Sequence, residues 1–223
     1  MAKAEPDWVK RDREQREREH ARKCARILKT PELLHGIYKD CGIASEFWNA
    51  KPEDFPKGVV ANAIGILQEG KRRSLYLFGK PGRGKTHFCS VVCRRFIDRD
   101  LVDALGKVCF VSLTQILLHI RAGFDEKRSE ERTLAEYIHK NLLCIDDIGV
   151  TRTSEFTREA FFYIADYRWR YNLPTVYITD QHYVRMLNEL FTKKIMSRIY
   201  HNRIHFKGRD RRQDNTPAIE VQE

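Results

Sequence analysis

The chain has 223 residues, of which 42% are hydrophobic and 11% aromatic, enough apolar material for one medium-sized domain, alone or with a small appendage. These fractions exclude a disordered chain. No apolar run approaches the roughly 18 residues of a membrane span, and the charged N-terminus does not have the pattern of a signal peptide. The formal net charge of +10 favours a polyanionic partner. The composition therefore predicts a basic cytoplasmic protein whose six cysteines, none in a CxxC pair, are reduced thiols, several of them in the core.

The basic excess lies at the two ends of the chain. Residues 10–29 carry a net charge of +5 and residues 193–212 a net charge of +7, which leaves −2 for the rest. The first run has the composition of a helix, and it is either a solvated helix with opposite charges three or four residues apart or a binding arm. We predict a charged helical arm over 1–35, a main domain over 36–212 and a flexible tail over 213–223.

Strands and helices alternate along the main domain. Short apolar runs predict five strands: Leu75–Phe78, Val108–Val111, Leu142–Ile145, Thr175–Thr179 and Arg203–Phe206. Helices are expected near 85–99, 113–122, 131–140, 155–171 and 183–199. This alternation predicts an α/β fold with right-handed crossovers, in which helices cover both faces of a mostly parallel five-stranded sheet. Such sheets bind ligands beyond the carboxyl ends of their strands.

A phosphate-binding loop follows the first predicted strand. The segment Gly79-Lys80-Pro81-Gly82-Arg83-Gly84-Lys85-Thr86 satisfies GxxxxGK[ST] between a strand and a helix. Its glycines let backbone N–H groups turn toward phosphate oxygens, and the helix N-terminus adds the positive end of its dipole. Lys85 is expected to neutralise the β- and γ-phosphates, and the Thr86 hydroxyl to hold Mg²⁺. The alternative, an incidental glycine-rich turn, accounts poorly for a pattern in this setting.

Two carboxylates end the third predicted strand. Asp146 is expected to hold Mg²⁺ through water, and Asp147 to orient or deprotonate the attacking water. The same residues would also suit a helix cap or a turn. Only the strand Val108–Val111 separates this acidic strand from the phosphate loop in sequence. That spacing favours the NTPases that insert an extra strand between the two motifs, and it disfavours small-molecule kinases.

Several motifs together resemble the DnaC/IstB-like AAA+ ATPases, a family of helicase loaders and transposition helper ATPases. They are Gly84-Lys85-Thr86-His87-Phe88, Cys144-Ile145-Asp146-Asp147-Ile148-Gly149, Tyr167-Arg168 with Asn172-Leu173-Pro174-Thr175, and the upstream stretch from Cys41 to Pro56. The resemblance spans 36–212. It implies an αβα ATPase core that works as an oligomer and binds ATP and Mg²⁺ at subunit interfaces. The residues it implies for the nucleotide are Gly79, Pro81, Gly82, Arg83, Gly84, Lys85, Thr86 and His87, with Thr86 and Asp146 for the metal.

The resemblance also implies three catalytic residues. Asp180 falls at the family's sensor position, where Asn is usual; an Asp can accept a hydrogen bond from the catalytic water but cannot donate an amide N–H to phosphate. Arg198 matches the arginine finger that reaches a neighbour's γ-phosphate, although it could be one more basic residue in a basic stretch. Asp147 stands where many relatives have Glu, and the shorter side chain predicts slow hydrolysis.

Partners are likewise implied by the resemblance. The elements in Ser112–Lys140 are expected to line a channel and touch single-stranded DNA. Candidate contacts are Arg121, Phe124, Lys127, Arg128 and Tyr137, although both aromatic residues could equally pack in the core. The arm is expected to dock on a client protein. The resulting hypothesis is an ATP-dependent loader of a replicative helicase. Alternatives are a transposition helper that serves a transposase, or a non-hydrolysing ATP-gated DNA-binding adaptor.

Overall fold

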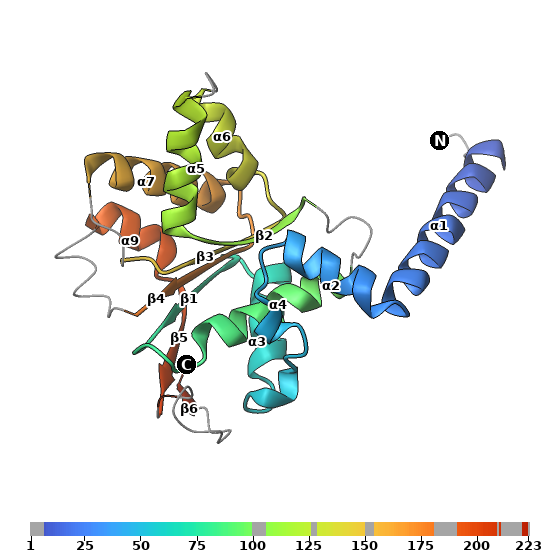
Figure 1. Cartoon of the computed structure of the whole chain (residues 1–223), viewed down its shortest axis with the longest axis horizontal. Coiled ribbons are helices and arrows are strands. Elements are labelled where there is room, and N and C mark those ends of the chain that lie inside the picture. Colours follow the sequence, from blue (N-terminus) through green and yellow to red (C-terminus); the bar gives the residue numbers. More distant parts are fainter. Residues whose placement is uncertain are drawn as a thin grey trace, which may run out of the picture.

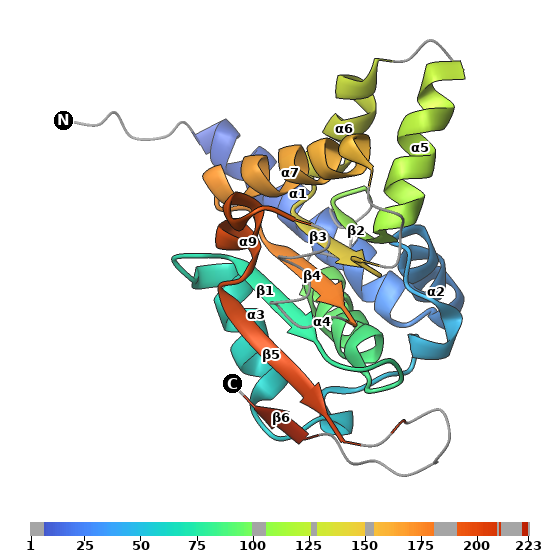
Figure 2. The ribbon, with the colours of Figure 1, turned by 90° about the vertical axis from the view of Figure 1, so that its left-hand side faces the viewer.

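The computed structural model describes residues 7–99, 106–125, 129–149, 154–180, 191–208, 210 and 220–222. A six-stranded sheet lies between two layers of helices (Figures 1 and 2). The strands are β1 (Ser74–Phe78), β2 (Val108–Ser112), β3 (Leu142–Asp146), β4 (Thr175–Thr179), β5 (Asn202–Lys207) and β6 (Glu220–Gln222). The helices are α1 (Asp7–Leu28), α2 (Pro31–Asp40), α3 (Val59–Glu69), α4 (Lys85–Arg99), α5 (Leu113–Asp125), α6 (Glu130–Ile138), α7 (Glu155–Arg170) and α9 (Lys193–Ile199), with short 3-10 helices at Ser45–Phe47 and Pro52–Asp54.

The strands are ordered β2-β3-β4-β1-β5-β6, and the first five are parallel. In register, Leu75 lies between Val176 of β4 and Asn202 of β5. The predicted five-stranded parallel α/β core is thus confirmed. So is the inserted strand, because β4 separates the phosphate-loop strand β1 from the acidic strand β3. Within the helix expected over 183–199, residues 183–190 fall outside the described residues, and α9 begins at Lys193.

Successive side chains along each strand point alternately into two separate hydrophobic cores, one on each face of the sheet. Leu75 and Leu77 of β1 point into the layer that contains α3 and α4, while Tyr76 and Phe78 point into the layer that contains α5, α7 and α9. Helices α3 and α4 contact β1, β2 and β3, whereas α5 and α9 contact β2 and β1. Because both faces are covered, every residue of β1 is buried, as expected for a central parallel strand.

The N-terminal arm begins outside the body of the protein and ends in its core. Helix α1 projects away from the sheet and its covering helices (Figure 1). Its last turn carries the buried Ile27, and α2 buries Ile37 and Tyr38. The Tyr38 hydroxyl donates to Asp98 Oδ1 of α4 at 2.8 Å. The boundary expected at residue 36 therefore falls inside a helix that packs on the main domain. None of the described helices is long and apolar enough to cross a bilayer.

A short strand extends the sheet near the C-terminus. Glu220–Gln222 forms β6, which pairs antiparallel with β5 so that Phe206 lies opposite Val221. These residues belong to the segment expected to be a flexible tail, and 213–219 lie outside the described residues. The three residues of β6 include only one apolar residue, so the sequence has no pattern there that predicts a strand. Pairing with the edge of β5 determines their position instead.

Candidate nucleotide-binding site

The phosphate loop connects the carboxyl end of β1 to the first turn of α4. Three of its residues have backbones that favour glycine: Gly79 (φ 145°), Gly82 (φ 75°) and Gly84 (φ 89°). A Cβ on Gly79 would also lie 2.3 Å from the Phe206 carbonyl oxygen. Helix α4 then begins at Lys85, and Phe88 N–H donates to the Gly84 carbonyl at 2.9 Å. The predicted strand–loop–helix arrangement is present, with the α4 N-terminus at the carboxyl edge of the sheet.

Lys85 is buried beneath this loop, with only 6% of its surface exposed. Its ammonium group donates to the carbonyls of Gly79 (2.8 Å) and Lys80 (3.0 Å), which fixes it inside the curve of the loop. It also forms an ion pair with Asp180 Oδ1 at 2.6 Å. Asp180 directly follows β4, so the structure brings the residue at the expected sensor position into contact with the loop lysine. A buried ammonium group needs such an anion nearby.

The loop also offers a spare hydrogen-bond donor. Arg83 Nη1 is buried, and the described residues provide no hydrogen-bond partner for it. A buried, unpaired donor of a guanidinium group is costly unless an anion pairs with it. Together with Lys85 and the α4 N-terminus, it makes the loop fit a phosphate group by its chemistry.

Thr86 and Asp146 provide paired oxygen atoms next to the loop. Thr86 Oγ1 donates to Asp146 Oδ2 at 2.9 Å, and Asp147 N–H donates to Asp146 Oδ1 at 2.7 Å. Burial raises the pKa of Asp146, while the hydrogen bonds from Asp147 and Thr86 oppose that shift. Neighbouring ligands of an octahedral Mg²⁺ ion lie about 3 Å apart. These two hard oxygen donors therefore fit a magnesium site.

Asp147 lies in a turn that orients it at the sheet edge. It has φ 55°, a left-handed conformation that Asp tolerates better than most residues. The next residue, Ile148, donates its N–H to the Ile178 carbonyl at 3.0 Å, and the Ile148 carbonyl accepts from Thr179 Oγ1 at 2.6 Å. The turn is thus fixed to β4, and the Asp147 side chain is exposed beside Asp146.

His87, the last residue assigned to the nucleotide, contacts the segment from Cys41 to Pro56. Its Nε2 atom lies 3.0 Å from Asp54 Oδ2, and its ring stacks on Phe47 with a centroid distance of 5.5 Å. Phe55 meets the same ring edge to face at 4.9 Å. The segment before α3 thus packs on the first turn of α4. His87 fixes that segment beside the phosphate loop.

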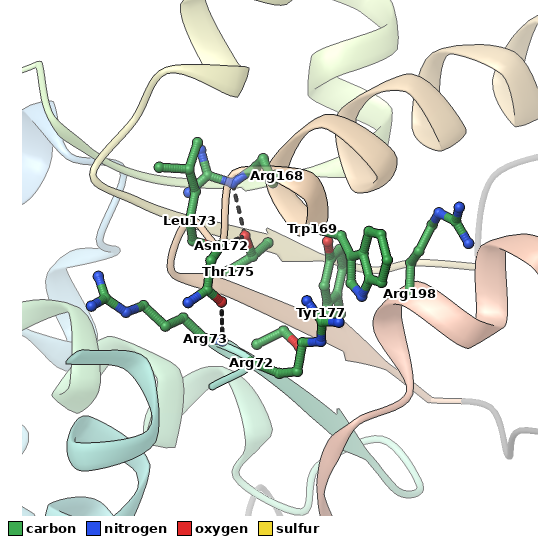
Figure 3. A pocket seen from close by; sticks show the side chains of 10 residues that line it. Arg72, Arg73, Arg168, Trp169, Asn172, Leu173, Thr175, Tyr177 and Arg198 are labelled. Atoms are coloured by element: carbon green, nitrogen blue, oxygen red, sulfur yellow. Dashed lines mark hydrogen bonds between the residues drawn. The ribbon is translucent and has the colours of Figure 1, made fainter. Parts of the chain in front are cut away.

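Arg198 lies at the opposite end of the sheet from the phosphate loop. Its Nε atom contacts Asp166 Oδ1 at 2.5 Å, and its guanidinium group lies 4.8 Å from the Trp169 ring centroid (Figure 3). Asp166 also pairs with Arg170 at 2.6 Å. Helix α9 precedes the amino end of β5, whereas the loop follows the carboxyl end of β1. Since five residues of a parallel strand span about 16 Å, Arg198 cannot reach the phosphates bound in its own loop.

The amino end of the sheet is strongly basic around Arg198. A cavity of about 480 Å³ is lined there by Lys71, Arg72, Tyr200, His201 and Arg203, among others. Among the described residues, no carboxylate pairs with Lys71, Arg72 or Arg203. The carboxyl end carries the carboxylates Asp146, Asp147 and Asp180 together with Lys85 and Arg83 of the loop. The amino end is therefore the more basic of the two ends.

The expected DNA contacts in 112–140 separate into two groups. Tyr137 is a core residue, 8% exposed, and its hydroxyl lies 2.8 Å from His119 Nδ1, so packing explains it. Arg121 is exposed and lies over the Phe156 ring at 5.8 Å. Lys127, Arg128 and the Phe124 side chain lie outside the described residues. Arg121 is the candidate that the structure leaves available.

Two carboxylates near functional groups were missed in the sequence. Asp210 lies beside the phosphate loop, so that a Cβ on Gly82 would fall 1.9 Å from its Oδ1 atom. It is the single acidic residue in the basic run 193–212, a signal that could have drawn attention to it. Asp166 holds Arg198, but nothing in its local sequence indicates a partner 32 residues away.

We expect Asp180→Asn to strengthen ATP binding by about tenfold. The substitution frees Lys85 from its ion pair and removes a negative charge beside the phosphates. A tenfold change in affinity corresponds to about 1.4 kcal/mol of binding free energy. Titration with a fluorescent ATP analogue at two salt concentrations would measure it. Asp147→Asn, which removes an exposed carboxylate from the same edge, should change the affinity by less than about threefold. Unchanged or weaker binding by Asp180→Asn would contradict this account of the Lys85–Asp180 pair.

The fold and the site define a P-loop nucleotide-binding protein of the AAA+ type. A glycine-rich loop with a buried lysine, an acidic strand two positions away in the sheet, and a polar residue after the intervening strand meet at one edge. Residues 10–211 match a family model described as IstB-like ATP binding protein. The chain belongs to this family.

Curated proteins and solved structures are also similar to the chain. The replicative helicase loader DnaC of Escherichia coli K12 is 29% identical over 133 residues, which cover 59% of this chain and 51% of DnaC. The chain thus spans about half the length of the curated relatives it matches. Among solved structures, DnaI has a TM-score of 0.57 at 19% identity, covering 73% of this chain and 92% of DnaI. The initiator DnaA bound to AMPPCP and single-stranded DNA has a TM-score of 0.60 at 18% identity, covering 72% and 50%. These likenesses support the AAA+ fold.

Proposed function

We propose that the chain is a slow ATPase that assembles head to tail and loads a replicative helicase onto single-stranded DNA. The observation that carries the ATPase part is the convergence of Lys85, Thr86, Asp146 and Asp180 at one sheet edge. The helicase part rests on the similarity to DnaC and on the basic arm.

The residues divide the work at the nucleotide. Loop N–H groups, Arg83 Nη1 and Lys85 bind the phosphates, and Lys85 exchanges Asp180 for phosphate oxygens as ATP enters. Thr86 and Asp146 hold Mg²⁺, which supplies charge neutralisation at the β- and γ-phosphates. Asp147 accepts a proton from the attacking water or orients it, and Asp180 accepts a hydrogen bond from the same water. A short Asp in the Asp147 position supports slow turnover, which suits a switch.

Arg198 completes the site of a neighbouring protomer. It lies too far from its own loop, and the basic end of the sheet that carries it complements the three carboxylates and the ATP phosphates at the other end. Contact between unlike ends gives a heterologous interface, which generates rings or helical filaments. Within one protomer Asp166 holds Arg198, so assembly requires the guanidinium group to leave Asp166 or share it with phosphate.

We expect Arg198→Ala to lower ATP turnover at least about 100-fold while leaving ATP binding largely intact, because Arg198 reaches a nucleotide only across the interface. Multiple-turnover phosphate release would measure it. Arg170→Ala is the matched control, because Arg170 pairs with the same Asp166 but is exposed, and its turnover should stay within about twofold of wild type. Mixing Arg198→Ala with Lys85→Ala should restore turnover, since each supplies what the other lacks. Wild-type turnover by Arg198→Ala alone would refute the shared site.

The identity of the client separates the main alternatives. The family description, IstB-like ATP binding protein, favours a transposition helper as the second candidate. Affinity capture with purified replicative helicase and purified transposase, each with ATP and single-stranded DNA, distinguishes the two. A loader retains only the helicase. A shortened chain that lacks residues 1–20 but keeps Ile27 and α2 should lose the client and keep ATP binding, because its core packing is intact. If the chain retained only the transposase, the helicase-loader proposal would be wrong and the transposition-helper function would take its place.

A further inference from the structure

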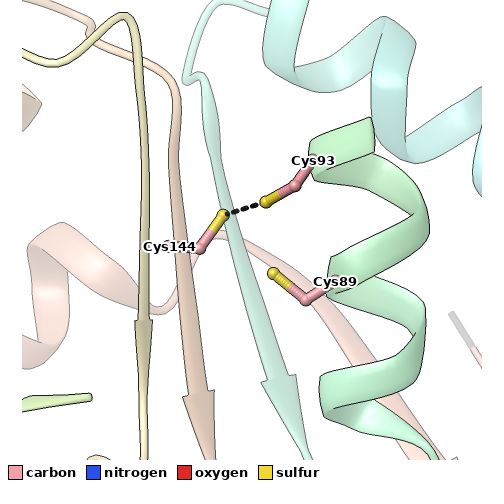
Figure 4. A group of neighbouring side chains, drawn as sticks. All are labelled: Cys89, Cys93 and Cys144. Carbon is pink, nitrogen blue, oxygen red and sulfur yellow. Dashed lines mark hydrogen bonds between the residues drawn. The ribbon is translucent and has the colours of Figure 1, made fainter. Parts of the chain in front are cut away.

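Three cysteines meet in the protein interior between α4 and β3 (Figure 4). Cys89 and Cys93 lie four residues apart on α4, and Cys144 lies on β3. All three are fully buried, and their Sγ atoms lie within 4.8 Å of one another. The Sγ atoms of Cys93 and Cys144 are 3.2 Å apart. The three sulfur atoms point into one space, which we call the three-thiol cluster.

The donor set of the cluster favours a soft monovalent ion. Thiolate bonds to a soft metal of about 2.3 Å let one ion bridge sulfurs up to about 4.6 Å apart. Structural Zn²⁺ requires four ligands, and in the described part of the chain the group contains three. Full burial excludes a surface water as the fourth. Sulfur-only donors in low number select Cu(I) over harder ions.

We propose that Cys89, Cys93 and Cys144 form a buried binding site for one Cu(I) ion. Each thiol that becomes a thiolate ligand releases its proton to solvent, and the copper keeps its oxidation state. Two thiolates and one thiol around Cu(I) carry a single net negative charge. The bound ion links α4, which carries Lys85 and Thr86, to β3, which carries Asp146. From its place in the protein interior, the ion therefore fixes these two elements of the nucleotide site relative to each other.

Anaerobic titration of Cu(I) from a coloured chelator tests the site with the full chain. Two variants retain three thiols each: Cys24→Ala/Cys41→Ala/Cys109→Ala keeps the cluster, and Cys89→Ala/Cys93→Ala/Cys144→Ala removes it. Wild type and the cluster-keeping variant should each take up one ion. The cluster-less variant should bind at least about 100-fold more weakly. Zn²⁺ in place of Cu(I) should not compete.

Two further measurements keep the test independent of folding defects. Cu(I) should raise the melting temperature of wild type and not that of Cys93→Ala, a single substitution that keeps the other two thiols. X-ray absorption at the copper edge should show sulfur ligands alone. Equal affinity of the two three-thiol variants, or a wild-type chain that forms only a Cys93–Cys144 disulfide and takes up no copper, would overturn the proposal. Because no readout uses ATP, either result leaves the proposed ATPase function to its own tests.

Discussion

Lys85→Ala should weaken ATP binding at least about 100-fold, a loss of about 2.7 kcal/mol. The ammonium group is buried, held by two loop carbonyls, and paired with Asp180. Without it, Asp180 leaves an uncompensated negative charge beside the phosphates, so the substitution removes an attraction and exposes a repulsion. Equilibrium binding of a fluorescent ATP analogue would measure the change.

Lys80→Ala is the matched control, because Lys80 lies in the same loop but its side chain is exposed. Its affinity for ATP should stay within about threefold of wild type. The double variant Lys85→Ala/Asp180→Asn should recover part of the lost affinity, because it removes the repulsion as well. If Lys85→Ala bound ATP as well as Lys80→Ala does, the loop would not be the nucleotide site.

Arg168→Met should lower the free energy of unfolding by about 3–5 kcal/mol. The guanidinium group connects the end of α6 to the start of β4, through the carbonyls of Ile138, Lys140 and Pro174 at 2.9, 2.9 and 2.6 Å. Methionine fills similar space but leaves these carbonyls without a donor in the interior, which is where the cost arises. Urea denaturation monitored by circular dichroism would measure it.

Arg170→Met tests whether position rather than charge decides this loss. Arg170 lies on the same helix two residues on, is exposed, and forms one ion pair with Asp166. Its replacement should cost less than about 1 kcal/mol. Similar destabilisation by both variants would mean that the carbonyl contacts of Arg168 contribute little to stability.

Features carried by consecutive residues could be predicted from the sequence. The loop 79–86 and the acidic pair at the end of β3 combine a local strand pattern with a fixed spacing, and the structure places both at one edge of the sheet. The Lys85–Asp180 ion pair could not be predicted, because it depends on β4 lying next to β1 in the sheet. The first residues of these two strands, Ser74 and Thr175, are 101 positions apart in the sequence. The Arg198–Asp166 pair depends in the same way on how α9 packs against α7.

Other features are absent from any local pattern. The three-thiol cluster brings together Cys93 and Cys144, which are 51 positions apart, and each of its cysteines taken alone has the pattern of an ordinary core residue. The packing of α2 on the core is another such feature, because its amphipathic pattern is one that an exposed helix can share. Ile37 and Tyr38 enter the core only because the segment that follows folds back beside β2, where Phe110 N–H donates to the Cys41 carbonyl at 2.8 Å.

The separation of Arg198 from its own phosphate loop has a consequence for how activity depends on assembly. In an open assembly built as proposed, each site needs the next protomer, so the terminal protomer has a loop that no arginine completes. The number of complete sites is then one fewer than the number of protomers, and an isolated protomer has none. Specific activity should therefore rise with protein concentration and level off as the assemblies lengthen, whereas a closed ring would reach its full value at one definite size.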